Sequence, residues 1–251
     1  MKIGSVVIGP ALPCRVVAEL GNAHNGDYDR ARRLCDAVQA SGADLIKFQC
    51  YLPEELVALR GNGAAPEPWG SQGWTMERLY RQAQTPLSWL MRLVAHCDEI
   101  GLPWFSSVFG QGSYTLLEAL GCPAYKIASL EYGKRGLVDM VRKAGKPTLR
   151  SCPHPTAPKT GDVMLYCPPG YPQAGFDVRT VQRGYVGFSY HGRDPVVPLL
   201  AAAFGAQLVE VHVELDDEPS ALESACCLPM TALTSLVSGV QRAAEVCRDA
   251  A

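Results

Sequence analysis

The feature that most constrains the fold is an alternation, repeated along 251 residues, of short apolar segments with amphipathic ones. Eight segments have the length and composition of strands, and most are followed by residues with helical spacing. These segments are residues 15–20, 44–49, 103–107, 124–129, 147–151, 162–167, 185–189 and 208–214. Eight such units predict an α/β fold, a (β/α)8 TIM barrel that forms one domain, residues 1–251. A doubly wound open sheet is the alternative, but no glycine-rich nucleotide-binding motif follows the first strand.

Three segments modify this regular pattern. Residues 2–8 are expected to form a short cap strand before the barrel, and Asp27 is expected to cap a helix at residues 28–41. The connection after the fifth strand has about ten residues, too few for an ordinary crossover helix, so that helix is expected to be reduced or missing. Residues 50–85 are rich in Gly, Pro and Trp and are typical of a lid or an interface, in which Trp69 and Trp74 are candidate contacts.

The bulk composition excludes several classes of protein. An apolar fraction of 47% allows a sizeable core, and a net charge of −2 with a pI near 6.2 gives no broad basic surface for nucleic acid. No apolar run is long enough for a membrane helix, and the N-terminus does not resemble a signal peptide. The ten cysteines are scattered and contain no CxxC pair, so we expect reduced core thiols in a cytoplasmic protein.

The segment LVEVHVE, residues 208–214, carries the clearest chemical signal. Its valines alternate with Glu210, His212 and a second glutamate, so one face of a buried strand is polar and requires partners. His191 ends the preceding strand segment, 21 residues earlier. Two histidines one strand–helix unit apart predict a pair of metal ligands. His96, in a helix, and His154, in the shortened connection, are given no role in the site.

Polar side chains near the end of each strand fall on the face that alternation turns inward. The active site of a barrel lies at the C-terminal ends of its strands, so these side chains are expected to converge. Two lysines and several hydroxyls suit a small polyanion, whereas two histidines near carboxylates suit a divalent transition metal in an open catalytic site. The set comprises Glu19, Lys47, Gln49, Ser107, Lys126, Ser129, Glu131, Ser151, Cys167, Tyr171, Ser189, His191, Glu210 and His212.

The lysines of this set also have a structural interpretation. Lys47 and Lys126 can pair with Glu19 and Glu210 in a buried network that needs no ligand. The single serines carry little information by themselves. The functional interpretation therefore depends on the set as a whole.

A series of motifs along the chain resembles the sialic acid synthase family, which makes N-acetylneuraminate and its pseudaminic and legionaminic acid relatives. The motifs are AELGNAHNGD, GADLIKFQ, YKIASLE, GKPTLRS, GYPQ, VGFSYH and FGAQLVEVH, in this order. The resemblance extends from about residue 16 to about residue 224. It implies a TIM barrel that condenses phosphoenolpyruvate with an N-acetylated aminosugar such as N-acetylmannosamine, using water, releasing phosphate and typically using manganese.

The resemblance also implies a role for each matching residue. His191 and His212 would bind the metal. The phosphoenolpyruvate would be held by Lys47, Ser107, Lys126, Ser129, Ser151 and Ser189. The sugar or the reacting water would face Glu19, Gln49, Glu131 and Tyr171. A metal on the histidines can polarise the sugar aldehyde, and Glu131 or Glu19 is the candidate base for the water.

The chain departs from the family pattern at several positions. Ala23 stands where the family has Asn after the first strand, and Pro169 stands where it has Asn after the sixth. The late GPDH motif is matched to EPSA, so that Ser220 replaces a sugar-contacting Asp. The family's C-terminal antifreeze-like domain is expected to be absent, because the sequence ends at Ala251. A changed acceptor, or a partner protein that completes the site, is the expected consequence.

Two other functions are compatible with the sequence. A Schiff-base aldolase would use Lys126 or Lys47, would resist EDTA and would be trapped by borohydride. A non-catalytic barrel, acting as a ligand sensor or as a subunit of an assembly, would bind metal or phosphoenolpyruvate without turnover. Since barrels of the family tend to dimerise, the resemblance further implies a homodimer.

Overall fold

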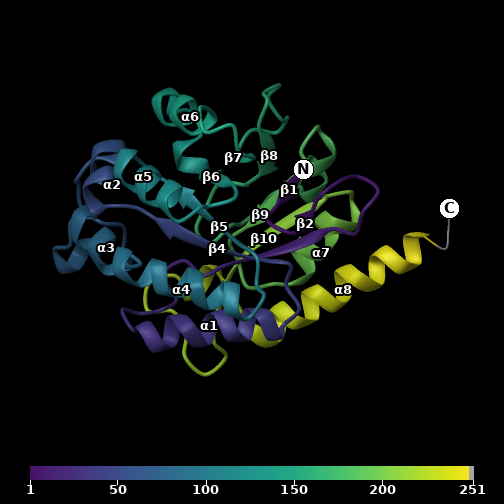
Figure 1. The fold of residues 1–251 in the computed structure, drawn as a ribbon, viewed down its shortest axis with the longest axis horizontal. Helices are drawn as coiled ribbons and strands as arrows, with labels where there is room; N and C mark the ends of the chain where they lie inside the picture. The colour runs from purple at the N-terminus through teal and green to yellow at the C-terminus, as the bar shows by residue number, and fades with distance from the viewer. Residues whose placement is uncertain (249–251) are drawn as a thin grey trace.

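The computed structural model describes residues 1–248, and its core is a closed barrel of eight parallel strands (Figure 1). The strand order is β10-β3-β4-β5-β6-β7-β8-β9, and β9 pairs with β10 to close the ring. The bounds are β3 (Arg15–Glu19), β4 (Leu45–Cys50), β5 (Trp104–Val108), β6 (Tyr125–Ile127), β7 (Thr148–Cys152), β8 (Val163–Tyr166), β9 (Gly187–Tyr190) and β10 (Leu208–Glu214). The closure confirms the predicted TIM barrel and excludes the open sheet.

Amphipathic helices surround the barrel (Figure 1). They bury Leu, Val and Ala side chains against the strands and leave charged faces in water. The Asp27 carboxylate accepts a hydrogen bond from the Arg30 backbone N–H at 3.0 Å, so the predicted N-cap is confirmed. The helices are α1 (Tyr28–Ala40), α4 (Leu87–Glu99), α5 (Gln111–Ala119), α6 (Arg135–Arg142), α7 (Val196–Ala203) and α8 (Met230–Arg248).

After β5, short 3-10 turns occupy three of the connections between strands. They are η2 (Ser129–Glu131), directly after β6, η3 (Val178–Gln182), between β8 and β9, and η4 (Ser224–Cys226), between β10 and β11 (Cys227–Pro229). Residues 153–162, between β7 and β8, contain no helix. The expectation of a missing crossover helix is therefore confirmed.

The N-terminal cap differs from its prediction. Residues 2–8 form a hairpin of two strands, β1 (Lys2–Ile3) and β2 (Val6–Val7), because a turn with Gly4 at φ +55° reverses the chain. Ile3 is fully buried, and Gly4 lies beside Pro103 just before β5. The hairpin therefore covers the N-terminal end of the barrel, opposite the strand ends where a site is expected.

A further strand, β11 (Cys227–Pro229), was not predicted. The pairing of β9 with β10 ends at Val211, and β11 pairs with the last three residues of β10, so that His212 lies opposite Cys227. This strand brings the segment after β10 back to the C-terminal mouth of the barrel.

The segment after β4 forms a small lid with its own core. It contains α2 (Pro53–Arg60), η1 (Gly70–Gln72) and α3 (Met76–Ala83). Tyr51, Leu56, Tyr80 and Phe109 pack together, and the Tyr51 hydroxyl donates to the Tyr80 carbonyl at 2.9 Å. The lid is therefore an ordered wall of the barrel mouth, which agrees with the first of the two roles expected for residues 50–85.

Two features of the described residues bear on the class of protein. None of the helices within residues 1–248 has the length and apolarity needed to cross a membrane. Nine cysteines are free thiols, and all but Cys14 are buried.

Candidate active site

A cavity of about 270 Å³ opens at the C-terminal ends of the strands, where the sequence predicted the site. Of the twelve residues to which the family resemblance gives a role, ten line the cavity, and Glu19 and Glu131 do not. The lining residues are Lys47, Gln49, Ser107, Lys126, Ser129, Ser151, Tyr171, Ser189, His191 and His212. Alternation along the strands and closure of the barrel thus bring together side chains from seven of the eight strands or the loops that follow them.

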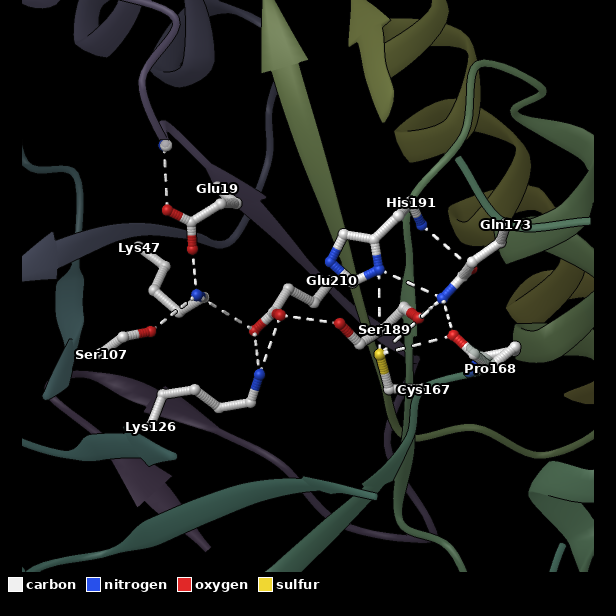
Figure 2. Close-up of polar contacts among 11 residues, drawn as sticks. Glu19, Lys47, Ser107, Lys126, Cys167, Pro168, Gln173, Ser189, His191 and Glu210 are labelled. Carbon is white, nitrogen blue, oxygen red and sulfur yellow. Dashed lines mark hydrogen bonds and ion pairs between the residues drawn. The ribbon is translucent and has the colours of Figure 1, made fainter. Parts of the chain in front are cut away.

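The floor of the cavity is a chain of alternating charges (Figure 2). The Lys47 ammonium contacts the Glu19 carboxylate and lies 3.8 Å from Glu210. Lys126 donates to both oxygens of Glu210, at 2.9 and 3.1 Å. All four side chains are buried. The ion pairs of Lys47 and Lys126 with Glu19 and Glu210, which the sequence allowed, are therefore present in the structure. Each lysine also lines the cavity.

These contacts set the charge states of the floor. Burial raises the pKa of the Glu210 carboxyl, but the two lysines outweigh it and hold that pKa well below its ordinary value. Burial likewise opposes the charge on Lys47, whose pKa is nevertheless raised by Glu19 and Glu210. Burial lowers the pKa of Lys126, and repulsion from Lys47 adds to this effect. Glu210 thus acts as a shared anion between two cations.

Hydroxyl groups line the same end of the cavity. Ser107 accepts from Lys47 at 3.0 Å, and Ser189 donates to Glu210 at 2.8 Å. The Ser151 hydroxyl is buried and has no hydrogen-bond partner. A buried hydroxyl without a partner costs free energy, so Ser151 is available to bind a ligand oxygen.

Glu131 is enclosed by a residue that the sequence did not single out. Arg60, at the end of α2, donates to both Glu131 oxygens at 2.6 and 2.8 Å, and Glu131 is fully buried. The guanidinium lies 5.7 Å from the centre of the Phe109 ring and lines the cavity. The lid thus presents Arg60, in place of the carboxylate, to any molecule in the cavity.

His191 is held by Gln173 (Figure 2). The Gln173 side-chain oxygen accepts from the His191 backbone N–H at 3.0 Å, and its amide nitrogen lies 3.1 Å from Nδ1. Burial, with the neighbouring charge of His212, holds the pKa of His191 well below its ordinary value. The His191 imidazole is therefore neutral, and its ring is packed against Tyr171 with ring centres 4.1 Å apart.

His212 lies beside His191, with ring centres 4.9 Å apart. Its Nδ1 lies 3.2 Å from a Glu223 oxygen but makes no hydrogen bond. Burial lowers the pKa of His212, but the Glu223 carboxylate outweighs it and raises that pKa. The other Glu223 oxygen accepts from the Asn22 backbone N–H at 2.9 Å. Glu223 is therefore fixed in a position facing His212.

The two histidines have the chemistry of a divalent metal site. Both are buried, His191 is neutral, and a ring nitrogen of His212 lacks a hydrogen bond. The amide nitrogen of Gln173 faces Nδ1 of His191, whereas a metal on Nε2 leaves the proton on Nδ1. Ligation by His191 through Nε2 therefore requires the Gln173 amide to turn its oxygen toward the ring.

The structure also changes the interpretation of the late motif. Ser220 does not line the cavity, since its hydroxyl is bonded to the Asn22 side chain at 2.9 Å. Glu223, three residues later, lines the cavity and supplies a carboxylate beside His212. A carboxylate from this segment therefore reaches the cavity, on Glu223. Pro169 is not part of the cavity wall either.

The outer wall of the cavity is largely apolar and comes from the lid. Trp69 is part of this wall, whereas Trp74 packs with Arg78, whose guanidinium lies 4.2 Å from the ring centre. The lid residues in the wall are Tyr51, Leu56, Arg60, Trp69, Met76, Leu79, Tyr80 and Ala83. The cavity thus has a charged floor, an imidazole side and an apolar outer wall.

Several site residues were missed because their signals were weak or ambiguous. Gln173 belongs to the motif GYPQ, which was noted without a role for the glutamine. Arg60 and Glu223 lie in loops or helix ends, where alternation gives no direction. Asn22 was likewise noted only as part of the turn after the first strand.

Comparison with known proteins gives concordant matches. The NeuB family model matches residues 34–167 and 176–250. The pseudaminic acid synthase of Helicobacter pylori (strain ATCC 700392 / 26695) is 30% identical over 92% of this chain and 74% of its own length. The pseudaminic acid synthase of Campylobacter jejuni subsp. jejuni serotype O:23/36 (strain 81-176) is 28% identical over 93% and 75%.

A solved structure has the same fold. The N-acetylneuraminic acid (sialic acid) synthetase of Leptospira borgpetersenii serovar Hardjo-bovis, in complex with citrate, superposes with a TM-score of 0.83. The identity is 21%, and the match covers 98% of this chain and 89% of that one.

Proposed function

The chain belongs to the NeuB family, and from this premise we propose that it joins phosphoenolpyruvate to the aldehyde of an aminosugar. The products would be a 2-keto-3-deoxy sugar acid and inorganic phosphate. This makes the protein a phosphoenolpyruvate-dependent transferase that forms a carbon–carbon bond, like the pseudaminic acid synthases to which it is similar.

The observation that carries the proposal is the convergence of Lys47 and Lys126 with several serine hydroxyls, among them the unpaired hydroxyl of Ser151, at one end of the cavity. Phosphoenolpyruvate is small and strongly anionic, and ammonium and hydroxyl donors match its phosphate and carboxylate. Ser151, whose hydroxyl has no partner, gains a hydrogen bond when such an anion enters. Ser107, Ser129 and Ser189 surround the same volume.

We assign the opposite side of the cavity to the acceptor. A divalent metal there, which we propose to be Mn²⁺, would polarise the aldehyde as a Lewis acid. His191 and His212 would hold it, and Glu223 would orient His212. Gln49 and Tyr171 line the cavity and supply hydrogen bonds for sugar hydroxyls. The apolar lid wall excludes bulk water around the reacting atoms.

Water must attack C2 after the carbon–carbon bond forms, and this step needs a base. Neither of the two carboxylates suggested by the resemblance lines the cavity, but Glu19 contacts Lys47, which does, and lies opposite His212 in the strand register. Glu131 is bound at both oxygens by Arg60 of the lid. We therefore propose that Glu19 accepts the proton of the water through Lys47, and that Glu131 holds Arg60.

The test is release of phosphate from phosphoenolpyruvate with Mn²⁺ and a panel of aldoses that includes N-acetylmannosamine. We expect release that depends on both the aldose and the metal, and that is lost in Lys126→Met. Phosphoenolpyruvate binding without turnover over the whole panel would favour a ligand-binding barrel. Activity that survives EDTA, with a lysine adduct trapped by borohydride, would favour the aldolase.

The proposal extends to the assembly, where we infer a homodimer of the barrel from the family resemblance alone. Light scattering after gel filtration measures the mass directly. A monomer at all concentrations would remove this part of the proposal and leave the chemistry intact.

A further inference from the structure

Three side chains with metal-ligand chemistry meet where β10 and β11 pair. His212, Glu223 and Cys227 each offer one ligand atom, and these atoms lie within 4.8 Å of one another. His212 and Cys227 are neighbours across the parallel pairing, which turns their side chains to the same side. The group extends from the cavity wall, at His212 and Glu223, to the fully buried Cys227 thiol.

The ligand atoms of the group have only weak partners or partners within the group itself. The His212 side chain is only 7% exposed, and its Nδ1 faces Glu223 without a hydrogen bond. The Cys227 thiol donates to the Glu223 carbonyl at 3.3 Å, a weak bond. A buried nitrogen with no hydrogen bond costs free energy unless a ligand satisfies it.

The backbone leaves space beside these atoms. At Gly21 (φ +53°), a Cβ atom would contact the Glu223 carboxylate and would lie 3.1 Å from Nδ1 of His212. The missing Cβ therefore allows the carboxylate and the imidazole to face each other closely. Tetrahedral zinc ligands are about 3.3–3.8 Å apart, given metal–ligand bonds of 2.0–2.3 Å. The three atoms, which lie within 4.8 Å of one another, need to draw together by about 1.5 Å at most to bind one ion.

We propose that His212, Glu223 and Cys227 form a binding site for Zn²⁺. The donor set of one nitrogen, one oxygen and one sulfur selects a borderline or soft cation, whereas Mn²⁺ prefers oxygen donors. On binding, the Cys227 S–H bond breaks, the sulfur keeps the electron pair, and the proton leaves to water. No change of oxidation state is involved.

The zinc site shares His212 with the metal pair of the proposed function. An ion on Nδ1 of His212 draws the ring toward Glu223 and away from its position beside His191. Zinc therefore competes with the catalytic metal. This consequence, unlike the zinc site itself, depends on the proposed function.

The first experiment needs no turnover and uses Co²⁺ as a spectroscopic substitute for Zn²⁺. We expect a sulfur-to-cobalt charge-transfer band in the near ultraviolet that Zn²⁺ removes. Cys227→Ser should abolish the band and weaken Zn²⁺ binding at least about tenfold, because losing a ligand costs no less than losing an outer-shell partner. Cys226→Ser is the matched control, since Cys226 is also buried but lies outside the group.

The outcomes separate the two proposals. No charge-transfer band in the wild type, or equal loss in the Cys226 and Cys227 variants, would overturn the zinc site. Glu223→Gln provides a second check, because it keeps the side-chain volume and should also weaken Zn²⁺ binding. In the enzyme assay, micromolar Zn²⁺ should inhibit the Mn²⁺-loaded wild type more than Cys227→Ser, relative to each variant's own rate. A wild type that shows the band but no turnover would count against the proposed function alone.

Discussion

Removing the guanidinium of Arg60 should strongly destabilise the lid, because Arg60 is the partner of a buried carboxylate. Glu131 is fully buried, and both its oxygens accept from Arg60, at 2.6 and 2.8 Å. Breaking a buried ion pair from one side costs about 3–5 kcal/mol. The Arg60 side chain is 23% exposed, so water screens part of the interaction and about 3 kcal/mol is expected for Arg60→Met.

The double variant separates the ion pair from the packing. Arg60→Met with Glu131→Gln leaves no buried charge, so its cost should fall to about 1 kcal/mol. The single variant Glu131→Gln loses a charge-assisted hydrogen bond and should cost about 1 kcal/mol, so the coupling energy of the double-mutant cycle should be about 3 kcal/mol. Arg81→Met is the matched control on the same lid. Arg81 is 53% exposed and forms surface pairs with Glu54 and Glu77, so Arg81→Met should cost far less stability than Arg60→Met.

The assay is urea unfolding at pH 7.5, followed by circular dichroism. Hydrogen exchange of the α2 amides, run alongside, detects a lid that opens on its own. The reasoning fails if Arg60→Met and Arg81→Met cost the same by both measurements, or if the coupling energy is below about 0.5 kcal/mol. Either result would mean that Arg60 does not cover the charge of Glu131.

Three other variants test separate parts of the structure. Lys126→Met should weaken phosphoenolpyruvate binding about 10–100-fold by calorimetry, and an equal loss in the exposed Lys143→Met would contradict the assignment. Burial lowers the pKa of His24 from 6.5 to about 4. The folded state therefore loses stability as the pH falls from 6.5 toward 4, because the unfolded chain binds a proton that the buried imidazole does not. His24→Gln should reduce the stability difference between pH 7 and pH 4 by about 3 kcal/mol, and an unchanged difference in urea unfolding would refute this. Asp27→Ala should cost about 1 kcal/mol in the same assay, and no loss would show that the bond to Arg30 contributes nothing.

The barrel itself could be predicted because its evidence is local. The alternation of strand and helix patterns, the short connection after β7 and the Asp27 cap are each written within a few consecutive residues. The polar side chains that point into the barrel could be predicted in the same way, since side chains alternate along a strand and parallel strands end at one edge. Lys47, Lys126, His191 and His212 accordingly lie where the pattern put them.

The partners of these residues could not be predicted in the same way. Alternation shows that Glu210 and Lys126 both point inward, but only the register of the closed barrel places their charges 2.9 Å apart. Glu131 looked like a free base until α2 placed Arg60 against it. Gln173 reaches His191 because a loop folds back over β9, and no periodic pattern encodes such a return.

The same distinction holds for the strand LVEVHVE, residues 208–214. Its sequence by itself determined a buried strand with one polar face, because the side-chain period of an extended chain is two. Only the tertiary structure decided what that face meets. Glu210 lies between two lysines, and His212 lies between His191 and Glu223 with Cys227 opposite. The physical reason is that alternation is a property of one strand, whereas these contacts depend on how the whole barrel closes.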